Sequence, residues 1–159
     1  MIDNFTVSRE IINIVHDAID KCEDILNIKG AINYCFDDSI KRIDLDLKKL
    51  MIIINPNLIF NNIDKYSVYR ILFMSIRIIY QAMEIEFKRF KTLFKYYDSD
   101  RIELWANEHL EYQKNKRKQY DFLNDAKAFS IFLMKYFFEI ETKENNKIKE
   151  RIKYFYNIF

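Results

Sequence analysis

The chain has 159 residues, of which half are hydrophobic and 31% charged, which indicates one globular domain over residues 1–159. It holds one glycine and one proline, which excludes the glycine-rich loops that cradle nucleotide phosphates. The longest apolar run, Leu50 to Ile54, is far shorter than the ~20 residues that cross a bilayer. Cys22 and Cys35 alone cannot form a disulfide framework. With no secretion signal at the start, we expect a cytoplasmic protein that does not bind membranes.

The first predicted element is a helix from about Ser8 to Ile28. Its apolar residues recur at steps of three and four, which places them on one helix face: Ile11, Val15, Ala18, Cys22 and Ile25. Ser8 is the predicted N-cap, and Gly30 is the predicted stop.

After the first helix the apolar period changes to two, which predicts a small sheet of about three strands. Residues 32–36 and 43–47 alternate between apolar and polar or small side chains. Residues 50–54 are continuously apolar, which suits a more buried strand. The turn-forming residues Asn55, Pro56 and Asn57 end this strand.

From Asp64 onward the pattern is helical, and it predicts a bundle of three to four helices. The first starts at Asp64 as N-cap and runs on to a break before Tyr97, and Asp98-Ser99-Asp100 form a loop and the next N-cap. The others cover about residues 101–117, 121–141 and 145–157. A helix, a small sheet and then a helical bundle make an α+β fold.

Three motifs in order distinguish the middle of the chain. They are Leu-Phe-Met-Ser-Ile-Arg-Ile-Ile-Tyr-Gln at residues 72–81, Trp105 with Glu108 and Tyr112, and Leu-Asn-Asp-Ala-Lys-Ala-Phe at residues 123–129. Over about residues 50–135 the chain resembles the small His-Glu-x-x-His zincin-like proteins of bacteria and their mobile elements. The resemblance implies a zincin-like fold.

The zinc-binding residues of that family are replaced in this chain. The two histidine positions are Met74 and Ile78, the general-base glutamate is Ser75, and the third ligand falls on Leu123. Zinc binding needs two imidazoles one helical turn apart, and the chemistry needs a carboxylate beside the bound water. The resemblance therefore implies a degenerate member without metal, cofactor or peptidase activity at this site. An ordinary apolar core stripe has the same appearance.

Arg77 and Asp125 match the family pattern, and the resemblance implies that both line the former metal cleft. They would then form a buried ion pair that fixes the register of two helices. The alternative is that each side chain faces water.

Two histidines are the remaining candidates for chemistry. His16 lies near Asp17 and Asp20, which leaves a hydrolase with a relocated site as an alternative, although a surface histidine is favoured. His109 lies between two glutamates on a predicted helix, where we expect a solvated face.

Charge is unevenly distributed along the chain: residues 1–60 carry −3, and the remainder carries +5 within a net charge of +2. The basic residues cluster at Lys114, Lys116, Arg117 and Lys118, and again at Lys147, Lys149, Arg151 and Lys153. Two solvated helix faces are the simpler interpretation. The alternative is a nucleic-acid-binding surface, with Tyr112, Tyr120 and Tyr154 stacking on bases.

Fourteen phenylalanines and eleven tyrosines exceed what one small core obviously needs. The excess is densest at Phe87, Phe90, Phe94, Tyr96 and Tyr97, and in the tail at Tyr154, Phe155, Tyr156 and Phe159. Exposed aromatic residues favour a protein partner or a second copy of the chain. We therefore expect a non-catalytic protein-binding module. By analogy with mobile-element proteins, we expect an inhibitor of host defence of the anti-CRISPR type.

Overall fold

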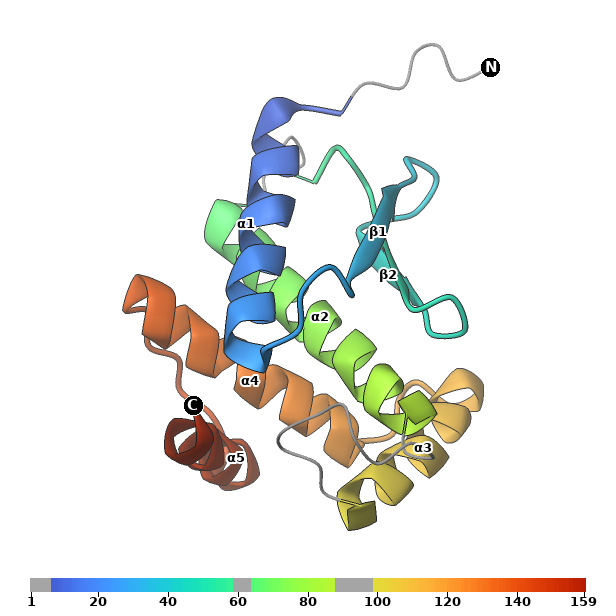
Figure 1. Cartoon of the computed structure of the whole chain (residues 1–159), viewed down its shortest axis with the longest axis vertical. Helices are drawn as coiled ribbons and strands as arrows, with labels where there is room; N and C mark the ends of the chain where they lie inside the picture. Colours follow the sequence, from blue (N-terminus) through green and yellow to red (C-terminus); the bar gives the residue numbers. More distant parts are fainter. Residues whose placement is uncertain (1–6, 59–63, 88–98) are drawn as a thin grey trace. The chain divides into compact units, whose positions relative to one another are not determined.

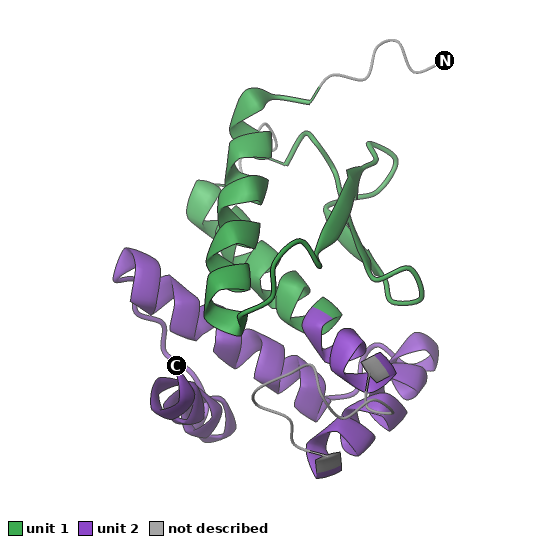
Figure 2. Ribbon diagram, in the orientation of Figure 1, with its two compact units in different colours: residues 1–79 green, residues 80–159 purple. Residues whose placement is uncertain are grey.

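The computed structural model describes residues 7–58, 64–87 and 99–159 (Figure 1). Contacts within the chain divide it into two compact units, residues 1–79 and 80–159 (Figure 2). Helix α2, Lys65–Phe87, contributes residues to both units. The elements follow the predicted α+β order of a helix, a three-stranded sheet and then helices.

Unit 1 begins with helix α1, Arg9–Leu26, which buries the apolar stripe that the sequence predicts. The Ser8 hydroxyl caps its start by accepting from the Ile11 amide at 3.2 Å. Its end differs from the prediction, because Asn27 takes the left-handed conformation at φ 56° and Gly30 follows only three residues later. An asparagine side chain tolerates that conformation, so the helix needs no glycine to stop.

The sheet of unit 1 has the order β1-β3-β2, with β1 at Asn33–Phe36, β2 at Ile43–Asp46 and β3 at Met51–Ile54. Strand β3 pairs in parallel with β1 and antiparallel with β2. The continuously apolar segment therefore occupies the centre, where Ile52 and Ile54 are buried. This confirms the sequence-based expectation of a more buried third strand.

Helix α1 contacts both the sheet and the first part of α2 within unit 1. His16 Nε2 bonds to the Tyr34 hydroxyl on β1, and the Tyr69 hydroxyl on α2 donates to Asp17 Oδ2 at 2.5 Å. The start of α2 is capped as predicted, since Asp64 Oδ1 accepts from the backbone amides of Tyr66 and Ser67.

Unit 2 holds the end of α2 and three further helices: α3 at Ser99–Lys114, α4 at Asp121–Phe138 and α5 at Asn146–Ile158. Helix α5 packs on α4 through aromatic rings, with Phe155 lying 5.6 Å from Phe129 between ring centroids. The Asn145 side chain caps α5 by accepting from the Ile148 amide. Helix α4 ends three residues before the predicted end, where Glu139 takes the left-handed conformation.

Two further expectations concern the segment after α2 and the absence of a membrane-spanning helix. The predicted break before Tyr97 and the aromatic residues from 88 to 98 lie outside the described residues. None of the helices within residues 7–58, 64–87 and 99–159 combines the length and hydrophobicity needed to cross a membrane.

Candidate functional site

The residues that the resemblance aligns with zinc ligands carry side chains that do not fit zinc. Met74, Ser75 and Ile78 lie on the part of α2 that belongs to unit 1, and Ser75 and Ile78 are buried. Thioether, hydroxyl and hydrocarbon groups replace the imidazole and carboxylate ligands that zinc takes. Leu123 belongs to unit 2, so its predicted approach to Met74 stays a prediction. Within the described ranges, no three His, Cys, Asp or Glu side chains gather as metal ligands.

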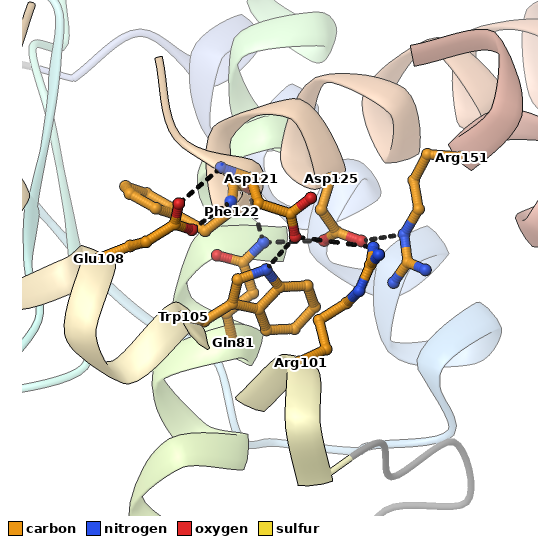
Figure 3. Close-up of polar contacts among 8 residues, drawn as sticks. All are labelled: Gln81, Arg101, Trp105, Glu108, Asp121, Phe122, Asp125 and Arg151. Atoms are coloured by element: carbon orange, nitrogen blue, oxygen red, sulfur yellow. Dashed lines mark hydrogen bonds and ion pairs between the residues drawn. The ribbon is translucent and has the colours of Figure 1, made fainter. Parts of the chain in front are cut away.

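Asp125 on α4 is the centre of a buried polar network in unit 2 (Figure 3). Its Oδ2 accepts from Gln81 Nε2 at 2.8 Å, and its Oδ1 accepts from Arg151 Nε at 2.6 Å. Gln81 Nε2 also donates to the Phe122 carbonyl at 2.9 Å. The network therefore joins the last part of α2, the start of α4 and the middle of α5.

The structure corrects one alternative for the pair Arg77 and Asp125. Neither side chain faces water, since Arg77 is 5% exposed and Asp125 is 1% exposed. Arg77 belongs to unit 1 and Asp125 to unit 2, so a direct ion pair between them stays a prediction. Within unit 2, Asp125 forms an ion pair with Arg151, which the sequence analysis places in a basic surface cluster.

Helix α3 contributes a second layer of polar contacts around the start of α4. Trp105 Nε1 donates to Asp121 Oδ2 at 2.8 Å, and Arg101 Nη1 lies 3.6 Å from the same oxygen. The two oxygens of Glu108 accept from the backbone amides of Asp121 and Phe122 at 2.9 and 3.0 Å. Glu108 therefore caps α4, because the side chain of the N-cap residue Tyr120 makes no capping hydrogen bond to the first turn.

This cap predicts the effect of removing one carboxylate. We expect Glu108→Ala to lower the free energy of unfolding by ~1–2 kcal/mol, because two amides of the first turn of α4 lose their acceptor. Urea unfolding followed by circular dichroism measures the change. Asn107→Ala, at another exposed position of α3, is the control. An equal loss in both variants would contradict a specific cap.

His109 on α3 is buried, so the expectation of a solvated face is wrong. The ring lies edge-on to Phe122 with 4.5 Å between centroids, and Nε2 lies 3.3 Å from Gln81 Oε1. Burial lowers the pKa of His109 from 6.5 to about 4, because the charged imidazolium loses its hydration. A neutral imidazole therefore fills this position near pH 7.

A pocket of about 390 Å³ opens beside the network, between the starts of α3 and α4 and one face of α5. Its lining comes entirely from unit 2 and is polar: Arg101, Gln119, Tyr120, Asp121, Asn124, Asp125, Lys147, Glu150, Arg151 and Tyr154. The guanidinium of Arg151 lies 4.1 Å above the Tyr154 ring. The buried network thus forms one wall of an open, charged pocket.

Most of the predicted basic surface is exposed. The exposed members are Lys114, Lys116, Arg117, Lys118, Lys147, Lys149 and Lys153. Arg151 differs, because its side chain is 13% exposed and paired with Asp125. Lys118 bonds to Glu111 at 3.0 Å, so part of the charge at residues 114–118 is compensated locally. Arg151 therefore stabilises the fold through an ion pair, although its sequence neighbours form an exposed basic cluster.

A second, more apolar groove of about 210 Å³ lies between the end of α4 and α5. Phe132 lines this groove. Its ring stacks on Tyr136 with 5.8 Å between centroids and contacts Tyr156 edge-on with 4.8 Å between centroids. Tyr136 is 58% exposed and Tyr156 is 52% exposed. We name Phe132, Tyr136, Ile140, Ile152 and Tyr156 the tyrosine face. Tyr156 is one of the residues that the sequence predicts for a binding surface. Tyr136 carries no comparable sequence signal.

Among the residues that the structure describes, His16, Asp17 and Asp20 do not form part of a metal-ligand cluster. His16 bonds to the Tyr34 hydroxyl, and Asp17 accepts from Lys21 at 2.7 Å and from Tyr69. The Lys21 ammonium and the Tyr69 hydroxyl hold the pKa of Asp17 below its usual value despite partial burial. Asp17 is thus engaged in a structural contact between α1 and α2.

Cys22 and Cys35 are both free thiols. Cys22 is fully buried in α1, and burial raises its pKa well above the usual value, as expected for an unreactive core cysteine. Cys35 is half-buried on β1.

Comparisons with protein-family models, with curated proteins and with solved structures find no match to this chain. The resemblance to zincin-like proteins therefore rests on its three sequence motifs. Members of these motifs, Gln81, Glu108 and Asp125, meet around Phe122 in unit 2.

Proposed function

We propose that the chain is a non-catalytic protein-binding module that acts by occupying a partner protein through the tyrosine face. The observation that carries the proposal is the pair of exposed rings, Tyr136 and Tyr156, on either side of Phe132. Tyrosine rings offer a large apolar contact area together with a hydroxyl that hydrogen-bonds across an interface. Such residues dominate the binding energy of many interfaces.

The groove lined by Phe132 and Tyr156 adds the shape that an interface needs. Ile131, Ile140 and Ile152 line it, and the Lys135–Glu141 ion pair of 2.9 Å lies at its edge. An apolar centre with a charged rim is the usual organisation of a protein interface. The Thr142 hydroxyl is buried in the same wall and bonds to no group within the described residues.

The side chains at the former ligand positions support a function without zinc chemistry. Met74, Ser75 and Ile78 offer neither the imidazoles nor the general-base carboxylate of the family. The resemblance to proteins of mobile elements makes a host-defence protein the first partner to test, as expected for an inhibitor of the anti-CRISPR type.

The test compares partner capture by three forms of the full chain. Tagged wild type, the double variant Tyr136→Ala/Tyr156→Ala and the control Leu110→Ala are incubated with host lysate, and captured proteins are quantified by mass spectrometry. Leu110 is 65% exposed on α3, so it matches the tyrosines in exposure but lies outside the tyrosine face. We expect at least ~10-fold less of one partner with the double variant only. Equal capture by all three forms would refute the proposal.

Nucleic-acid binding is the second candidate, favoured by the seven exposed basic residues of the two clusters. Lys116 lies 5.9 Å from the Tyr112 ring centroid, which places a cation beside an aromatic side chain of the kind that stacks on bases. Binding to a single-stranded oligonucleotide that weakens steeply between 50 and 200 mM salt, roughly as counterion release requires, would support it. Salt-insensitive or absent binding would reject it.

A further inference from the structure

Arg151 has a geometry that leaves part of its guanidinium to the pocket in unit 2. Its Nε bonds to Asp125 at 2.6 Å (Figure 3). Its guanidinium carbon lies 4.1 Å from the centroid of the Tyr154 ring. These two contacts hold the side chain in one orientation. Within the described residues, its two terminal nitrogens, Nη1 and Nη2, make no hydrogen bond or ion pair. A fixed pair of parallel N–H donors therefore lines an open cavity.

The acidic residues that share this cavity wall are already engaged by other donors. Asp125 accepts from Gln81 and Arg151, and Asp121 accepts from Trp105 with Arg101 beside it. Their charges are therefore largely compensated within the protein. Glu150 is the remaining acid, and it lies exposed on α5, where water screens its charge.

Lys147 adds a second cation to the same wall. It precedes Arg151 by four residues on α5, so the two side chains lie one helical turn apart on one face. Lys147 is exposed and makes no ion pair within the described residues. Gln119 and Asn124 contribute amide groups to the same pocket. The wall thus combines the fixed guanidinium of Arg151, the exposed ammonium of Lys147 and neutral amide groups.

We propose that this pocket binds a small molecule through an oxyanion, either a carboxylate or a phosphate, with Arg151 as the recognising residue and Lys147 as the second contact. The terminal edge of a guanidinium matches two oxygens of either group in a bidentate arrangement. The cavity of about 390 Å³ lies in the size range of small-ligand sites. None of its lining residues belongs to the tyrosine face, so this proposal stands apart from the proposed protein binding.

The experiment titrates the full chain with three probes by isothermal calorimetry: inorganic phosphate, adenosine 5′-monophosphate and citrate. Binding of phosphate and the mononucleotide identifies a phosphate site, and binding of citrate alone identifies a carboxylate site. Arg151→Lys keeps the charge beside Asp125 and removes the fork, so we expect affinity to fall about tenfold or more. Lys147→Gln removes an exposed charge and should lower affinity about threefold.

Lys149→Gln is the control, since Lys149 is exposed on the same helix and does not line the pocket. We expect it to bind the probe as wild type does. If Arg151→Lys impairs folding, Lys147→Gln against Lys149→Gln decides the outcome. The proposal is overturned if none of the three probes binds at millimolar concentration. It is also overturned if Lys149→Gln weakens binding as much as Lys147→Gln, since attraction would then be non-specific.

Discussion

Asp125→Ala is expected to lower the free energy of unfolding by about 3–5 kcal/mol, the largest effect of any single substitution that we propose. The substitution removes the acceptor that neutralises Arg151, whose side chain is 13% exposed. It also leaves Gln81 Nε2 with only the Phe122 carbonyl. The loss is costly because Nε of Arg151 points to the buried side of the residue, where the alanine methyl group replaces neither the hydrogen bond nor the compensating charge of Asp125. Urea unfolding at pH 7 measures the loss.

Two further variants separate the buried pair from ordinary surface electrostatics. Glu141→Ala breaks the exposed ion pair with Lys135 and should destabilise the protein far less than Asp125→Ala does, because water and salt screen such pairs. The double variant Asp125→Leu/Arg151→Met replaces both charges by apolar groups and should regain much of the stability lost in Asp125→Ala. A loss for Asp125→Ala no larger than that for Glu141→Ala would contradict the role of the network.

The secondary structure was predictable where one local signal dominated. The apolar stripe of α1 and the continuous apolar run of β3 are both set by burial, and the structure places both in the core of unit 1. Side-chain caps at Ser8, Asp64 and Asn145 also act over three residues, so the sequence reveals them directly. Helix ends at Asn27 and Glu139 were missed because a left-handed residue other than glycine leaves a weak signal.

The polar site was less predictable because its contacts link residues far apart in the chain. Arg151 lies in a run of basic residues, and only its bond to Asp125, 26 residues away, distinguishes it from its neighbours. His109 stands between two glutamates, a pattern typical of a solvated face, yet it packs against Phe122. Sequence spacing reports which side of a helix a residue occupies, whereas the packing of neighbouring helices decides whether that side meets water.

His109 should make stability depend on pH in the mildly acidic range. Burial places its pKa at about 4 in the folded chain, against 6.5 in the unfolded chain. The unfolded state therefore takes up a proton first as pH falls. Above pH 6.5 the imidazole is neutral in both states, and the free energy of unfolding keeps its full value. As pH falls from 6.5 toward 4, protonation of the unfolded state lowers the free energy of unfolding by about 3 kcal/mol. His109→Gln lacks this titration, so its free energy of unfolding should change less between pH 7 and 4.5.

The difference between the two pH profiles isolates His109 from the carboxylates, which titrate in both proteins. Repeating the measurement in 0.5 M NaCl should leave this difference in place, because the cause is loss of hydration on burial and not attraction between exposed charges. NMR titration of the imidazole in the folded protein should give a midpoint near pH 4. Parallel profiles for wild type and His109→Gln would mean that the imidazole stays hydrated in the folded state. The ring would then lie outside the buried network.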